Sequence, residues 1–343
     1  MNPRANLASR LAFGLCGLGG VAFIGLAHPQ TVAPPPASAA PAFQDRYIGG
    51  GSLVPDISAG DGSTSDTSGL ARSLQIDGIA SLMSSHGSGS SSNVSENGIV
   101  ARRQWETARY GAWSLDASAR TGGSNQGPFE KGQGGVVTLR QRGMPFDGNW
   151  QADNALGDLN SPDINLARFQ QRFYLPTGAV QGLETEWRGP SGLQLVAGGG
   201  KPGLYDGIVV PNFRTLEGST ATAGAQWFPA SNWTVGGQFV EAHDVNLSVG
   251  PVIEGASLMS SSTGLISTAW ADRGEHIQFN LLDGEVSGKS NALGAWLDAS
   301  KTQGRFVQNA GIFRIDPNLT WGNQVISSDA QGGYYRLNYQ SRQ

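Results

Sequence analysis

Residues 113–120 read WSLDASAR, and apolar and polar side chains alternate along this stretch without a break. The same period of two returns in four later stretches, at residues 221–227, 233–239, 277–281 and 335–340. Alternation of this kind places one row of side chains on an apolar side of a strand and the other row on a wet side. No run of helical period competes with it after residue 101, so the sequence predicts an all-β protein.

The composition supports this prediction and excludes several classes of protein. Glycine contributes 50 of 343 residues, about twice the usual share. Charged residues make up only 15%, against about 25% in an ordinary soluble domain. The formal net charge is −4 and the basic residues are scattered, so nucleic acid is not an expected partner.

The predicted connections differ in length. Tight turns are expected at 189–192, 229–232 and 272–275, whereas the connections over 241–264 and 316–332 are long and polar or glycine-rich. Short turns at one end of a sheet and long loops at the other are typical of barrels that span an outer membrane.

Tryptophans stand beside the short turns. Trp187, Trp227 and Trp270 each lie two residues before a turn, and Trp233 follows one directly. The indole ring is apolar but its N–H needs a wet partner, so tryptophan gathers where lipid headgroups meet hydrocarbon. We therefore expect these four residues to form a membrane-interface girdle; the alternative is cross-strand packing at the hairpins of a β-sandwich.

Taken together, residues 101–343 resemble the outer-membrane β-barrel proteins of Gram-negative bacteria as a class, in porin-like or usher-like form. The usher-like resemblance rests on LGDLNS at 156–161 and RFYLP at 172–176. The resemblance implies an antiparallel transmembrane β-barrel that contacts outer-membrane lipid and the barrel-insertion machinery. Such barrels commonly end on an aromatic residue, whereas this sequence ends at 341–343 with SRQ. We therefore expect either an unusual closure or the front part of a larger barrel.

Three regions follow along the chain. Residues 1–42 resemble a signal peptide, because Arg4 and Arg10 precede an apolar run that ends in small residues near Ala40; an uncleaved membrane anchor is the alternative. Residues 43–100 are rich in glycine and serine and predict a flexible periplasmic linker. Residues 101–343 form the barrel region, with room for roughly 12 strands.

The residues needed for chemistry are sparse. After residue 42 the histidines are His86, His243 and His276, which are far apart in sequence, and the one cysteine, Cys16, lies in the apolar run. No pattern of metal ligands, nucleophile and base, or cofactor loop is present. We therefore expect no enzyme activity, no metal and no cofactor.

The polar rows of the strands are the remaining candidates for a function. If Leu115 and Leu297 face lipid, the neighbouring polar residues face a lumen: Ser114, Asp116, Ser118, Arg120, Asp298 and Ser300. Lumen charges tune which solutes pass. The alternative is that Asp116 and Arg120 satisfy each other in a packed interior.

These features predict an outer-membrane channel that translocates or exports a polymer or a solute. Two alternatives stay open at this point. One is a structural or adhesive surface protein with a plugged barrel, and the other is a soluble secreted β-sandwich that binds a ligand.

Overall fold

The computed structural model describes residues 72–87, 90–124, 132–168, 173–247, 258–326 and 329–339, all within the unit Gln44–Gln343. Strands dominate: β1 (Arg72–Gly87), β2 (Ser90–Thr107), β3 (Gly111–Ser124), β4 (Gly132–Phe146), β5 (Trp150–Asn160), β6 (Ala179–Arg188), β7 (Gln194–Asp206), β8 (Asn212–Thr215), β9 (Ser219–Ala230), β10 (Trp233–Val245), β11 (Met259–Asp272), β12 (Glu275–Val286), β13 (Ala292–Gln303), β14 (Phe306–Ile315), β15 (Thr320–Trp321), β16 (Gln324–Val325) and β17 (Ala330–Tyr339).

In the described parts of the chain, helical structure is limited to short pieces. These are η3 (Asp147–Asn149), α3 (Asn165–Arg168) and η4 (Pro190–Gly192). Among the residues that the structure describes, no helix is both long and apolar enough to cross a membrane.

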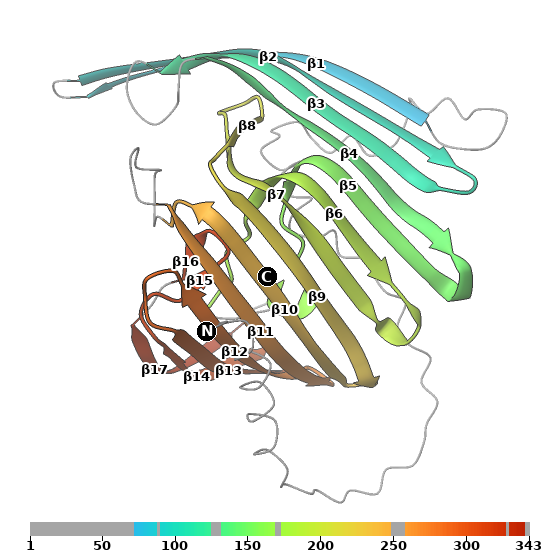
Figure 1. Ribbon diagram of the computed structural model, residues 1–343, viewed down its shortest axis with the longest axis vertical. Helices are drawn as coiled ribbons and strands as arrows, with labels where there is room; N and C mark the ends of the chain where they lie inside the picture. Colours follow the sequence, from blue (N-terminus) through green and yellow to red (C-terminus); the bar gives the residue numbers. More distant parts are fainter. Residues whose placement is uncertain are drawn as a thin grey trace, which may run out of the picture. The chain divides into compact units, whose positions relative to one another are not determined.

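The strands form one antiparallel sheet in which almost every strand pairs with the next one in the chain (Figure 1). Fourteen strands follow one another from β1 to β17, while β8 pairs with β7 outside this path and β15 with β16 forms a separate two-stranded sheet. The all-β antiparallel prediction is confirmed. A β-sandwich needs two large sheets face to face, so the sandwich alternative is wrong for the described residues.

The sheet has two free edges. Within the described part of the chain, β1 pairs only with β2 and β17 only with β14, so the sheet is open between β1 and β17. This agrees with the expectation of an incomplete barrel.

The linker predicted over residues 43–100 is wrong from Arg72 onward. Strand β1 and the first half of β2 occupy this region, with Leu74 opposite Arg103 and Ile76 opposite Ala101. The ladder is held by backbone groups, so a serine- and glycine-rich strand can still pair when a neighbouring strand is present. These two strands also explain why fourteen strands replace the expected 12. Residues 43–71 and the predicted signal peptide lie outside the described residues.

The two faces of the sheet differ in what covers them. Three connecting segments, 161–168, 207–211 and 316–326, bind side chains that share one face, which we call the inner face. The opposite, outer face carries exposed apolar side chains such as Leu156, Leu183 and Ile312.

A hydrophobic core lies on the inner face of the C-terminal half of the sheet. Leu265, Leu282 and Trp296 on β11–β13 pack there with Ile164 and Leu319 of the connecting segments. The segments 161–168 and 316–326 therefore fill the space beside these strands with apolar side chains.

Candidate functional site

The outer face is apolar along most of its strands. On β13, Leu293, Leu297 and their same-face neighbours point away from the core, while Trp296 and Asp298 are buried. The period of two predicted this division from the sequence, because successive side chains of a strand point to opposite faces. An exposed apolar surface that extends over many strands is unusual for a protein in water.

The four tryptophans of the predicted girdle all lie on the outer face beside short turns. Trp233 stands directly opposite Trp270 in the pairing of β10 with β11. Trp227 is opposite Val235 at the neighbouring hairpin, and Trp187 is opposite Leu195. Their contact with lipid stays a prediction.

The sequence reading missed further aromatic residues at the same end of the sheet. Trp105 and Trp113 flank the turn between β2 and β3 and stack with ring centroids 6.0 Å apart. The ring centroid of Trp187 lies 4.6 Å from that of Phe146 and 6.5 Å from that of Trp150. The signal that singled out Trp187, an aromatic residue beside a short turn, also applies to these residues.

The six predicted lumen residues share the inner face with the groups that bind the connecting segments. Ser118 Oγ donates a hydrogen bond of 2.6 Å to the carbonyl of Pro211. Ser114, Asp116 and Arg120 lie on the same face of β3, and Asp298 and Ser300 lie on the inner face of β13. Which of them a solute would meet depends on their burial.

Asp116 belongs to a charged band on the inner face. Its Oδ1 lies 2.8 Å from Arg102 Nε and its Oδ2 lies 3.3 Å from Arg140 Nη1. The pairing of Asp116 with Arg120, the alternative left open by the sequence, is wrong. Residues four apart on a strand are too far along it to meet, whereas Arg102 is directly opposite on β2. The Arg102 side chain is 47% exposed, so this band faces open space.

Arg120 does not line open space. Its Nη1 lies 3.0 Å from Glu96 Oε1 and its Nη2 lies 3.2 Å from Asp206 Oδ1. The Arg120 side chain is 6% exposed. Glu96 in turn accepts hydrogen bonds from three consecutive backbone N–H groups, those of Ile208, Val209 and Val210. The segment 207–211 is thereby held against β2 and β3, and it covers Arg120.

Asp298 is covered as well. It is 2% exposed and accepts a hydrogen bond of 2.5 Å from the hydroxyl of Tyr334 on β17. Ser300, two residues further along β13, is half-buried. The expectation that Arg120 and Asp298 meet a solute in the lumen is therefore corrected: both lie on the predicted face, but protein covers them.

A set of inner-face glutamines binds the segment 161–168. Gln238 accepts from the N–H of Ile164 at 3.0 Å, and Gln226 accepts from the N–H of Leu166 at 3.0 Å. Gln278 donates to the carbonyl of Leu166 at 2.8 Å. These side chains take the place of the backbone partners that the segment lacks, which is why a segment with only one helical turn, α3, can be buried here.

One titratable group in this segment is perturbed. Burial raises the pKa of Asp163 from 3.8 to about 6, opposed by the hydrogen bond from Gln238 Nε2 at 2.8 Å. The segment therefore carries a carboxyl group that is easier to bury when it is protonated.

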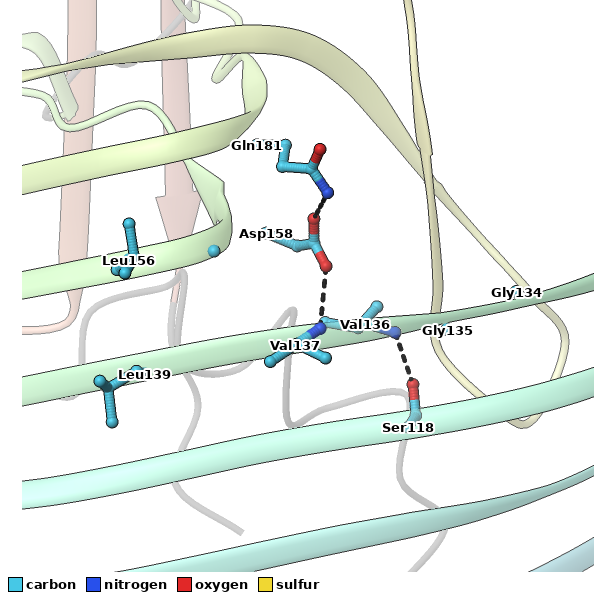
Figure 2. A pocket seen from close by; sticks show the side chains of 10 residues that line it. Ser118, Gly134, Gly135, Val136, Val137, Leu139, Leu156, Asp158 and Gln181 are labelled. Atoms are coloured by element: carbon cyan, nitrogen blue, oxygen red, sulfur yellow. Dashed lines mark hydrogen bonds between the residues drawn. The ribbon is translucent and has the colours of Figure 1, made fainter.

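A cavity of about 630 Å³ lies where β4 and β5 separate (Figure 2). The ladder between these strands ends at Thr138 and Gly157, and Gly157 has φ 120°, a conformation that favours glycine. Beyond it, Asp158 accepts the N–H of Val137 at 2.8 Å and a hydrogen bond from Gln181 at 3.0 Å. Asp158 thus holds β4, β5 and β6 together at the point where they diverge.

The comparisons with known proteins give similarity in fold only. No family model and no curated protein matches the chain. Among solved structures, the chain is similar to OccK8 (OprE) of Pseudomonas aeruginosa, with a TM-score of 0.40 and 12% identity over 78% of this chain and 69% of that one. It is also similar to OmpT, an outer membrane protein of Vibrio cholerae in trimer form, with a TM-score of 0.32 and 8% identity over 77% of this chain and 99% of that one.

Proposed function

We propose that the chain forms the wall of a porin-like outer-membrane channel through which small hydrophilic solutes pass. The observation that carries the proposal is the division of a single antiparallel sheet into an apolar, exposed outer face and a polar inner face. Exposed leucines over several strands, with tryptophans at the short-turn end, fit hydrocarbon and headgroups better than water. The outer membrane of a Gram-negative bacterium, the insertion machinery and the signal peptide are parts of this proposal.

The inner face supports a narrow path rather than a wide one. The segments 161–168 and 316–326 occupy the side of β10–β13, while the charged band of Arg102, Asp116 and Arg140 stays partly exposed on β2–β4. We infer that solutes pass along this band, where positively and negatively charged side chains replace part of the water bound to a solute.

This arrangement favours small solutes over a polymer. Export of a folded polymer needs a wide lumen, and the buried segments narrow it by packing Ile164 and Leu319 against the sheet. A structural or adhesive role with a plugged barrel is the second candidate, because the same segments would plug the lumen completely if they met the charged band.

Four measurements test the proposal. The protein refolded in detergent should migrate differently on a gel before and after boiling, and it should float with phospholipid vesicles. In planar bilayers it should give discrete conductance steps, and Asp116→Asn should change the ratio of cation to anion permeability. Flotation without conductance would favour the plugged surface protein, and a chain that stays monodisperse in plain buffer would overturn the membrane assignment.

A further inference from the structure

One row of side chains crosses six strands of the outer face at the same level. The strand pairings place Leu74 opposite Arg103, Arg103 opposite Leu115, and the row continues through Leu139, Leu156 and Leu183. Five of its six members are leucines, and Leu74, Leu156 and Leu183 are 66%, 58% and 58% exposed. Arg103 is therefore the one cation in a row of side chains that is otherwise apolar.

Arg103 lies further from the turn than Trp105, the aromatic residue of its own strand. Trp105 is two residues nearer the turn on the same face, which places Arg103 about 7 Å further from the turn. The guanidinium carbon of Arg103 lies 5.4 Å from the centre of the Trp105 ring, and Trp105 stacks on Trp113. The side chain is thus directed back toward the short-turn end, where headgroups meet hydrocarbon in the proposed function.

Arg103 has one cationic neighbour on the outer face of the adjacent strand. Of the described side chains on the outer face of β1–β4, Arg72 and Arg103 are cations, and aspartate and glutamate are absent from this set. Arg72 stands opposite Trp105 and lies two residues before Leu74 on the same face of β1. A cation placed among lipid-facing side chains is costly unless an anion accompanies it, and such residues mark functional sites.

We propose that Arg103, beside Trp105 and Leu74, binds the phosphate of an anionic phospholipid at the short-turn end of the sheet. The planar guanidinium donates two parallel hydrogen bonds to phosphate oxygens, and the apolar row receives the acyl chain. The occupant is a lipid headgroup and not free phosphate, because the site joins a phosphate-binding group to exposed leucine side chains. This inference rests on the proposed function, since it requires that the outer face meets lipid.

The test uses the full chain reconstituted in vesicles of equal parts phosphatidylglycerol and phosphatidylcholine, followed by extraction into detergent and measurement of the lipid retained by the protein. One arginine near a membrane surface contributes about 1 kcal/mol of attraction to anionic lipid, which is about fivefold in affinity. Wild type should retain phosphatidylglycerol over phosphatidylcholine, and Arg103→Leu should lower this preference about fivefold.

Matched variants separate the site from general effects of charge. Arg103→Leu completes the leucine row, so its gel mobility before boiling should stay that of the folded protein. Arg103→Lys should keep part of the preference. Arg109→Leu removes the same charge from the turn between β2 and β3 and should leave the preference unchanged.

Four outcomes overturn the inference. If wild type and Arg103→Leu prefer phosphatidylglycerol over phosphatidylcholine equally, Arg103 is not the binding site. If inorganic phosphate alone displaces the bound lipid, the site binds a free anion instead. If Arg103→Leu dissociates an oligomer in light scattering, a second copy of the chain occupies the surface. If wild type does not float with vesicles at all, the proposed function itself fails, which is distinct from flotation without lipid preference.

Discussion

The carboxylate oxygen Oε2 of Glu96 accepts a hydrogen bond of 2.7 Å from the backbone N–H of Val209, although 113 positions separate the two residues. The same oxygen accepts from Ile208 at 3.0 Å and Val210 at 3.3 Å, while Oε1 lies 3.0 Å from Arg120. One side chain of β2 therefore holds the segment 207–211 against the inner face. It also neutralises Arg120, which no solute reaches.

Glu96→Gln should release this segment. An amide offers one acceptor oxygen in place of two, so either the backbone N–H groups or Arg120 lose their partner, at a cost of about 1.5–3 kcal/mol for a hydrogen bond to a charged group. Val210 is fully buried, so Val210→Cys in a Cys16→Ser background reports the release as faster reaction with a thiol reagent. Glu106→Gln on the same strand serves as the control, and equal labelling rates in both variants would contradict the assigned role of Glu96.

The segment 207–211 also requires glycine at position 98. A Cβ added to Gly98 would lie 2.5 Å from the carbonyl oxygen of Ala119 and 2.9 Å from Val210 Cγ1. We expect Gly98→Ala to lower the free energy of unfolding by about 1–3 kcal/mol, because the neighbours have to shift. Gly78→Ala on β1, where nothing lies within 4 Å, should be close to neutral. Denaturant unfolding of the two variants in the same detergent compares them, and equal losses would show that backbone freedom and not crowding is responsible.

The docking of segment 161–168 should depend on pH through Asp163. Its pKa is raised from 3.8 to about 6, so the folded state favours the neutral carboxyl. The stability that this group contributes is complete below about pH 4 and is lost as the pH rises through about 6, a difference of about 3 kcal/mol. Amide hydrogen exchange in the segment should therefore be slower at acid pH.

Asp163→Asn keeps an oxygen acceptor for Gln238 and removes the charge. The variant should show slow exchange in segment 161–168 at both pH values, after correction for the intrinsic rates. Unchanged pH dependence in Asp163→Asn would assign the effect to another group.

The outer face can be tested at two leucines. If Leu297 contacts hydrocarbon near the middle of a bilayer, its replacement by arginine should cost about 2–4 kcal/mol of unfolding free energy in lipid vesicles. Leu115 stands opposite Arg103 near the short-turn end, so Leu115→Arg should cost only about 0–1 kcal/mol. Ser300→Arg, on the inner face of the same strand as Leu297, should not show a loss that depends on lipid. A near-neutral result at Leu297 would remove the lipid-facing assignment.

The prediction from sequence succeeded where a residue's face depends only on its place in a strand. Leu297 and Asp298 were assigned to opposite faces and lie there, because a period of two leaves no other arrangement. It failed for β1 and for the first half of β2, where serine and glycine hide the period of two and the ladder depends on a partner strand. The missed aromatic pair, Trp105 and Trp113, shows that the turn signal extends further than the four predicted tryptophans.

The amino-acid sequence by itself determined that this chain builds antiparallel strands with an apolar face, a polar face and aromatic residues beside short turns. These are local properties, set by the alternation of side chains and by turn residues. Only the tertiary structure decided which polar residues are open to solvent, since Arg102 stays exposed while Arg120 and Asp298 are covered. The physical reason is that burial on the inner face depends on segments brought back from distant parts of the chain, and their hydrogen bonds to Glu96 and the inner-face glutamines leave no periodic trace in the sequence.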